Sequence, residues 1–143
     1  MSVYGDILAD VKSLSGISPF AGNVIIRKSP IVLKADTLPL LLICPAFQFD
    51  SEEAFEGKII LDYKVLIVLV FAGNQTWETG LSTMFDAAQA IRHAVHVTVL
   101  STATTVFDSS IKLNPAFDDA ALLKNYDWHA IELTYRSSES RNS

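Results

Sequence analysis

The stretch from Lys58 to Ala72, KIILDYKVLIVLVFA, predicts a long β-strand that is covered on both faces. Its first half alternates, with Asp62 and Lys64 on one face, whereas its second half has no polar residue at all. A strand of this kind must be shielded from water on both sides. Helices of the chain can cover one face, and a small domain often leaves the other face to a neighbour, so the segment predicts assembly. The side chains expected at that contact are Leu66, Val68 and Val70.

The spacing of apolar residues predicts two helices and four further extended segments around this strand. Pro30 and Pro45 cannot donate to a sheet ladder, so the two early extended segments are expected to be interrupted, bulged or partly at an edge. The predicted helices are Val3 to Leu14 and Leu81 to His96, and the predicted strands are Val24 to Leu33, Leu40 to Phe49, Val106 to Leu113 and Trp128 to Arg136.

This order of elements favours an α+β fold. We expect a mostly antiparallel sheet of about four to five strands with two main helices packed on one face. The 143 residues are expected to form a single domain, and residues 137–143 a frayed tail.

The composition narrows the classes of function. Half of the residues are apolar, and the net charge of -5 offers no broad basic surface to nucleic acid. The single cysteine, Cys44, lies in an apolar stretch and predicts a buried residue in a reducing compartment. The start of the chain has no secretory pattern, and the longest apolar run is too short for a membrane helix. We therefore expect a protein without specific DNA affinity and without a membrane partner.

The segment from Asp50 to Gly57, DSEEAFEG, carries four carboxylates and no base. One interpretation is a solvated loop, which is how most charge runs behave. A cation site is a second one, although the spacing of a calcium loop is missing. The third is an exposed arm that meets a partner, in which Phe55 is the anchor.

Candidate catalytic and metal-binding residues are few. His93, His96 and His129 could in principle share a metal, but histidines near a helix C-terminus are favoured by the backbone dipole, and no HExxH pattern is present. Cys44 with His93 or His129 could form a nucleophile and base, yet an apolar setting raises the pKa of a thiol. We predict no catalytic residue, no metal and no cofactor.

The layout resembles the tail terminator, or tail-completion, proteins of long-tailed bacteriophages. The resemblance runs from the helix at Tyr4 through PLLLICPAFQF, GKIILDYKVLIVLVFA and LSTMFDAAQAIRHAV to NYDWHAIELTYRSSE. Members of that family are similar in having a short N-terminal helix, a β-hairpin with an extended loop, a long strand, a packed helix and a late aromatic strand.

The resemblance implies a virion structural protein of the tail or neck, assembled in the host cytoplasm. It implies a homomeric ring, usually a hexamer, that caps the tail tube and provides the surface for head joining. The implied partners are other copies of the chain, the tail tube protein and the head-tail connector protein, with DNA passing through the channel without specific binding. A ring needs heterologous contacts between unlike patches.

Charged residues suggest how such a contact is made. In one hypothesis, basic residues of one copy meet the acidic segment of the next; in another, the acidic segment lines the channel and repels DNA. The basic residues are Arg27, Lys28, Lys34 and Lys58, and the acidic segment contributes Asp50, Glu52, Glu53, Phe55 and Glu56.

Three alternative functions stay open. One is another neck, connector or baseplate-associated subunit. A second is a dimeric α+β module that binds a small ligand. A third is a small enzyme with a site near Cys44 or His129.

Overall fold

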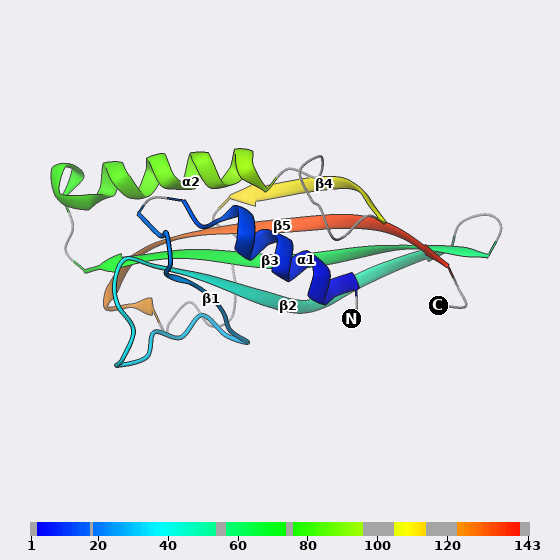
Figure 1. The fold of residues 1–143 in the computed structure, drawn as a ribbon, viewed down its shortest axis with the longest axis horizontal. Helices are drawn as coiled ribbons and strands as arrows, with labels where there is room; N and C mark the ends of the chain where they lie inside the picture. Colours follow the sequence, from blue (N-terminus) through cyan, green and yellow to red (C-terminus); the bar gives the residue numbers. More distant parts are fainter. Residues whose placement is uncertain are drawn as a thin grey trace.

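The computed structural model describes residues 3–17, 19–53, 57–73, 76–95, 105–113 and 123–140. Within them, one five-stranded sheet carries two α-helices (Figure 1). The elements are α1 (Val3–Leu14), β1 (Val24–Ile26), β2 (Leu40–Glu53), β3 (Lys58–Ala72), the π-helical turn η1 (Trp77–Leu81), α2 (Ser82–Ala94), β4 (Val106–Leu113) and β5 (Tyr126–Ser140).

The sheet is mixed but mostly antiparallel, in the order β1-β2-β3-β5-β4. Only the pairing of β1 with β2 is parallel. The central strand, β3, pairs along its whole length with β5, from Lys58 opposite Ser140 to Ala72 opposite Tyr126. The predicted α+β class is therefore confirmed, with β1 and β4 as the edge strands.

Both helices pack on the same face of the sheet. Ile7 and Val11 of α1, and Met84 and Ile91 of α2, share one buried cluster with alternate residues of the central strands. Tyr135 joins the end of α2 to β5, because its hydroxyl donates a 2.7 Å hydrogen bond to the Val95 carbonyl oxygen. The amphipathic stripes of the two helices, which the sequence places at helical spacing, therefore face the sheet as expected.

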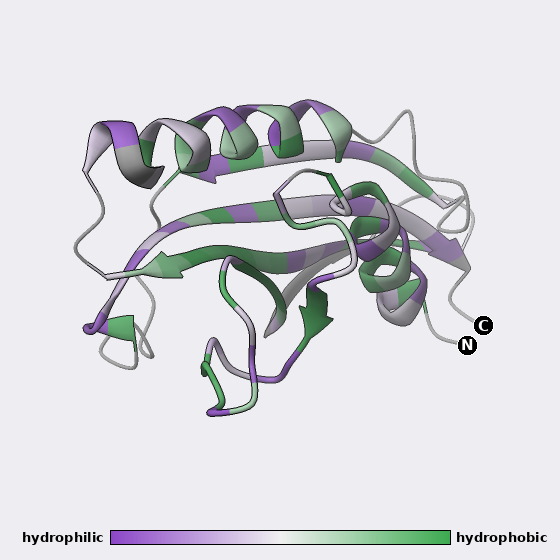
Figure 2. Cartoon of the chain, turned by 60° about the vertical axis from the view of Figure 1, so that its left-hand side comes forward, coloured by the Kyte–Doolittle hydropathy of each residue, from purple (hydrophilic) through white to green (hydrophobic). Residues whose placement is uncertain are grey.

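The apolar half of β3 is buried on both faces, which explains why its sequence stops alternating. Val65, Ile67 and Leu69 point toward the helices, and Leu66 and Val68 point to the opposite face. In Figure 2 this half of β3 is hydrophobic throughout, whereas β5 alternates. Burying one such side chain contributes about 1.5–3 kcal/mol, so the apolar half of β3 adds substantially to the fold's hydrophobic stabilisation.

Proline shapes the two early strands as predicted. The register between β2 and β3 shifts between Pro45 and Phe49, where the ladder is irregular. The first extended segment is shorter than expected, since β1 ends at Ile26 and the chain then leaves the sheet before Pro30.

The last strand is longer than the sequence suggested. Residues 137–140 continue β5 and pair with the start of β3, so the expectation of a frayed tail is wrong for them. The Tyr63 hydroxyl donates a 2.7 Å hydrogen bond to Glu139 Oε2, and the hydroxyls of Thr105 and Ser137 lie 2.6 Å apart. The polar residues are thus held by strand pairing; residues 141–143 lie outside the described part.

The connection after β3 needs a residue without a side chain. A Cβ atom on Gly73 would lie 2.6 Å from the backbone oxygen of Asn125, which is closer than real contacts allow. Gly73 therefore lets the backbone after β3 pass close to the backbone before β5.

The helix predicted from Leu81 begins at Ser82, after the π-helical turn of η1.

Candidate functional site

The face of the sheet away from the helices is covered by the chain itself. Leu66 has an exposed fraction of 7%, and Val68 and Val70 are fully buried. They pack with Leu40 and Leu42 in a second cluster. The cover includes Val32 and Leu38 from the segment before β2 and Leu123 from before β5, while Ile25, Tyr126 and Trp128 of the neighbouring strands pack beside them on the same face. The expectation that this face is left open for a neighbouring copy is therefore wrong.

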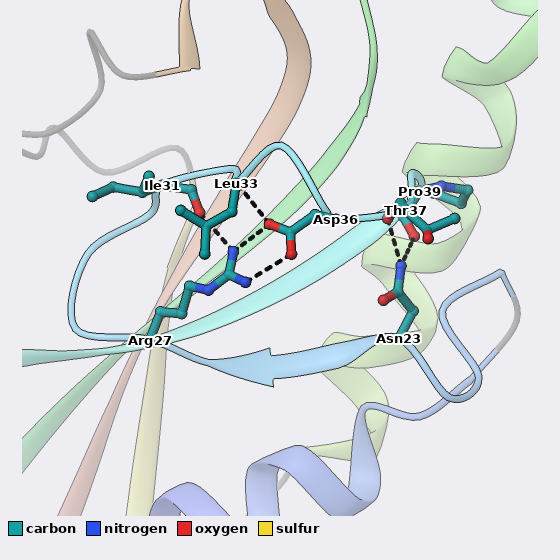
Figure 3. A network of polar contacts seen from close by, with 7 residues as sticks. All are labelled: Asn23, Arg27, Ile31, Leu33, Asp36, Thr37 and Pro39. Atoms are coloured by element: carbon teal, nitrogen blue, oxygen red, sulfur yellow. Dashed lines mark hydrogen bonds and ion pairs between the residues drawn. The ribbon is translucent and has the colours of Figure 1, made fainter.

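Much of the cover comes from residues 27–39, which we call the strap. The strap is irregular, yet a dense set of polar contacts holds it (Figure 3). Arg27 forms a two-pronged ion pair with Asp36, in which Nη2 lies 2.7 Å from Oδ1 and Nη1 bonds Oδ2. Arg27 Nη1 also donates to the Ile31 carbonyl oxygen at 2.9 Å, and the Leu33 N–H donates to Asp36 Oδ2 at 2.7 Å.

The strap is tied down a second time near its end. The side-chain amide of Asn23 donates to the carbonyl oxygens of Thr37 and Pro39, both at 2.7 Å (Figure 3). Asn23 directly precedes β1, and its own carbonyl oxygen accepts from the Leu41 N–H at 3.1 Å. These bonds join the start of β1, the end of the strap and the start of β2, so the strap is fixed at both ends.

The ion pair changes the role expected of Arg27. Its guanidinium is committed to Asp36 of the same chain, and the two side chains have exposed fractions of 18% and 7%. The hydrogen bond from Arg27 lowers the pKa of Asp36 to about 2. The hypothesis that Arg27 meets the acidic segment of another copy is corrected accordingly, because its charge is neutralised inside the strap.

The outer surface of the strap stays exposed. Ile31 and Leu33 have exposed fractions of 41% and 51%, and Lys28 and Lys34 are exposed as well. Pro30 is buried and Val32 half-buried, so residues 30–33 alternate between the sheet and solvent. The strap thus covers one apolar surface and presents a smaller one of its own.

The acidic segment is more ordered than a loop. Asp50 and Glu53 mark a stretch of β2 that pairs with Asp62 to Ile59 of β3, which corrects the expectation of a loop from Asp50. Lys58 begins β3 and is exposed on the same hairpin, so it belongs with the acidic residues and not with the strap. Phe55 and Glu56 lie outside the described residues. We call residues 50–58 the acidic hairpin end.

β4 forms the second candidate surface. It is an edge strand, and no strand pairs with its outer side among the described residues. Phe107, Ile111 and Leu113 have exposed fractions of 52%, 42% and 46%. An edge strand with open backbone groups and apolar side chains is a template for a further chain. On its other face, Asp108 and Ser110 lie beside the ion pair between β5 and β3, in which Arg136 Nε is 3.0 Å from Asp62 Oδ1.

Sequence reasoning missed an exposed aromatic cluster beside α2. The rings of Trp77 and Phe85 are stacked with centroids 6.2 Å apart, and Phe85 meets His129 edge-on at 5.6 Å. Trp77 and Phe85 have exposed fractions of 59% and 43%. Phe85 lies at the margin of the buried stripe of α2, whose member Met84 is buried. Burial lowers the pKa of His129, and the charge of Arg92 adds to this effect.

The candidate catalytic groups do not come together. Cys44 is buried on the face opposite the helices, where it pairs with Leu66. His129 pairs with Leu69 on the helix face, and His93 lies exposed on α2. The sheet separates the thiol from both imidazoles, so neither can act as its base. His96, the remaining histidine of the considered metal set, lies outside the described residues.

The described part of the chain offers little other chemistry. It holds no group of three or more His, Cys, Asp and Glu side chains arranged for a metal. None of its helices is both long and apolar enough to cross a membrane. The concave surfaces are shallow; one runs along α2 and is lined by Asp86, Gln89, Ala90, His93 and Ala94.

No protein-family model and no curated protein sequence matches the chain.

Proposed function

We propose that this protein is a phage virion structural subunit that forms a homomeric ring, which terminates or completes the tail tube and offers the surface for head joining. One observation carries the proposal. The chain begins with a short helix, continues through the antiparallel pair of β2 and the long strand β3 and then the packed helix α2, and ends in the aromatic strand β5, an order similar to the one that the resemblance implies. The resemblance places a hairpin before the long strand, whereas β1 and β2 pair in parallel.

The surfaces of the protomer support a ring. The two edges of the sheet are unlike, since one carries the three-residue β1 beside the strap and the other carries the eight-residue β4. Exposed apolar side chains lie near both edges, with Ile26, Ile31 and Leu33 at one and Phe107, Ile111 and Leu113 at the other. A closed ring is built from contacts between unlike surfaces, and this protomer has unlike surfaces to offer.

Phage particles assembled without the protein test the proposal. We expect overlong tails if the protein stops tube growth, or tails of normal length without heads if it acts in joining. Adding back the purified protein should restore tails of normal length bearing heads. Particles that assemble normally in its absence would contradict both versions.

The alternative functions predict different outcomes. A module for a small ligand should be a stable dimer at high concentration, which a mass measurement in solution detects. A small enzyme should lose turnover when Cys44, His93, His96 or His129 is replaced singly, whereas these replacements should leave a structural role largely intact.

A further inference from the structure

The β1 edge of the sheet has backbone groups that no described residue bonds (Figure 1). The Asn23 carbonyl oxygen accepts from the Leu41 N–H at 3.1 Å, and the Arg27 N–H donates to a β2 carbonyl oxygen at 3.0 Å. Backbone groups of alternate residues point to the same side of a strand. Val24 and Ile26 therefore direct their N–H and carbonyl groups away from β2, toward the open side of the edge.

The β4 edge has open groups of the same kind. The Ser138 N–H donates to the Thr105 carbonyl oxygen at 3.1 Å. Since bonded and non-bonded pairs alternate along an antiparallel ladder, every second residue of β5, counted back from Ser138, bonds β4. The register then leaves the backbone groups of Ser109, Ile111 and Leu113 pointing outward.

The start of β4 is protected against further pairing, and its end is not. The ladder with β5 is irregular just before Asp108, and Asp108 Oδ1 accepts from the outward Ser109 N–H at 2.9 Å. Bulges are one means by which natural sheets blunt an edge. At Ile111 and Leu113 the ladder is regular and no described side chain caps the backbone, and their exposed fractions are 42% and 46%. The open stretch therefore lies in the second half of β4.

The side chains at both open edges lie on the helix face of the sheet. Ile111 and Leu113 oppose two β5 residues of the helix-side cluster, and opposed residues share a face. Val24 packs against the same cluster, and Ile26, two residues further on, shares its face and has an exposed fraction of 39%. The surface beside β1 is hollowed, and the small residues that line this hollow are Ala9, Ser13, Gly16 and Gly22.

The directions of the strands suit a ring. β1 is parallel to β2 and each of the other pairs is antiparallel, so β1 and β4 run in opposite directions. Rotation about an axis roughly along the strands carries one copy onto the next without reversing strands or exchanging faces. The β4 of one copy then meets the β1 of the next in antiparallel direction, with the helices of both copies on the same side. In this pairing the open groups of the two edges oppose each other.

We propose that β4 of one copy adds to the free edge of β1 in the next copy. Ile111 then lies opposite Ile26. At the next bonded pair, Leu113 lies opposite Val24. Each pair exchanges two backbone hydrogen bonds, and the aliphatic side chains of β4 enter the hollow beside β1. A shift of two residues in one direction would set Ile26 against the capped Ser109, and in the other direction would set Val24 beyond the end of β4. The inference rests on the proposed ring and names the contact that builds it.

The contact by itself is small. Two bonded residue pairs and a few half-exposed aliphatic side chains bury less than about 1,200 Å², the lower bound of a standard stable interface. An isolated pair of copies is therefore expected to dissociate readily. In a closed ring every copy makes the contact twice, so breaking one contact leaves the copies at a high effective concentration. The size of the contact thus favours a closed assembly over a stable dimer.

A disulfide across the contact tests the register. Between the two bonded pairs, Ile25 faces Lys112 in a non-bonded pair, where Cα atoms lie about 4.5 Å apart, a separation that a disulfide spans. We expect mildly oxidised I25C/K112C to form a ladder of covalent multimers on a non-reducing gel, ending at the number of copies in the ring. The one native cysteine, Cys44, is buried, and the wild-type protein oxidised in the same way gives the background.

Two controls make the crosslink specific. V24C/K112C places the thiols on opposite faces of the sheet and should form at most about a tenth of the covalent product. A mixture of the single variants I25C and K112C should give only covalent dimers with one copy of each, because each copy then carries one half of the contact. Circular dichroism of every variant shows whether the fold is retained.

Lysine at the edges tests the apolar part. I26K or I111K, introduced into I25C/K112C, places a charge in the contact, and we expect the yield of the ladder to fall at least about tenfold. L33K is the matched control and should leave the yield unchanged, because Leu33 is 51% exposed on the strap, outside the contact. All three positions are exposed, so none of these changes should lower the temperature of unfolding.

Three results would overturn the inference. One is an I25C/K112C protein that forms no covalent multimers above the wild-type background. Another is a V24C/K112C protein that crosslinks as well as I25C/K112C, since the register would then be wrong. The third is a covalent dimer from K112C alone in a yield equal to that of the ladder, which indicates that β4 pairs with β4 of a second copy about a two-fold axis. None of them decides the proposed function, which the tails of particles lacking the protein test separately.

Discussion

Asp36 shows how one side chain organises an irregular segment. Its carboxylate accepts from both terminal nitrogens of Arg27 and from the Leu33 N–H. Hydrogen bonds to an ionised carboxylate are about twice as strong as those between neutral groups. Without Asp36, the guanidinium of Arg27 would be left partly buried and unpaired, which is costly. This charge therefore holds the middle of the strap, while the bonds from Asn23 to Thr37 and Pro39 hold its end.

The variant D36N should be less stable than the wild-type protein by an amount that depends on pH. At neutral pH we expect it to lower the free energy of unfolding by about 1 kcal/mol or more. The pKa of Asp36 is lowered to about 2 from 3.8, so its stabilising effect is complete above pH 4 and is lost as the pH falls toward 2. Urea unfolding of wild type and D36N should therefore converge over this range. A difference that stays constant down to pH 2 would contradict the ion pair.

The strap and β3 form one unit of packing. Alternate residues of β3 face the helices or the strap, so the helices and the strap are both needed to shield the strand from water. The strap is a loop by its backbone, yet it fills the place that a second layer of helices takes in a doubly covered sheet. Its inner residues act in stability, and Ile31 and Leu33 on its outer side are exposed.

Val70→Ala should therefore affect folding. Val70 is fully buried on the strap side, and we expect a loss of about 2 kcal/mol in the free energy of unfolding from removed methyl groups and the cavity they leave. Leu33→Ala, on the outer side of the strap, is the matched control and should change stability by less than about 0.5 kcal/mol. Equal effects at the two positions would contradict the assigned cover. Chemical denaturation measures both.

The end of β5 gives a second prediction about an element. Ending the chain after Arg136 removes Ser137 and Glu139, together with the hydrogen bonds to Thr105 and Tyr63. At about 1 kcal/mol for each bond, we expect a loss of about 2 kcal/mol, seen as a lower unfolding midpoint in urea. Ending the chain after Ser140 keeps the pairing with β3 and should have little effect. Equally small effects of both truncations would indicate that residues 137–140 are frayed and add little to stability.

The whole molecule is polarised along its length. The acidic hairpin end and the strap oppose each other in charge and lie roughly 30 Å apart along β2. A protomer with unlike ends and unlike sheet edges suits the heterologous contacts that the proposed ring needs.

Much of the fold follows from local periodicity. The helix from Val3 to Leu14 and the strands from Lys58 to Ala72 and from Val106 to Leu113 have the predicted bounds, because helical and alternating patterns are properties of neighbouring residues. The charged tail after Arg136 was misjudged, since its strand pairs with distant residues. The stacked Trp77 and Phe85 were missed because periodicity places residues on a helix face but does not say how far the sheet extends beneath it.

The pattern of the chain determined that β3 is covered on both sides, since a strand without polar residues cannot face water on either one. What covers it was decided by tertiary contacts that no local pattern shows. Arg27 pairs with Asp36, and Asn23 donates to Thr37 and Pro39, and these bonds place Val32 in the same cluster as Val68 of the strand. The hydrophobic effect depends on how much apolar area is buried and not on which group buries it. Whether the same chain or another copy covers β3 therefore depends on where the tertiary structure places the strap.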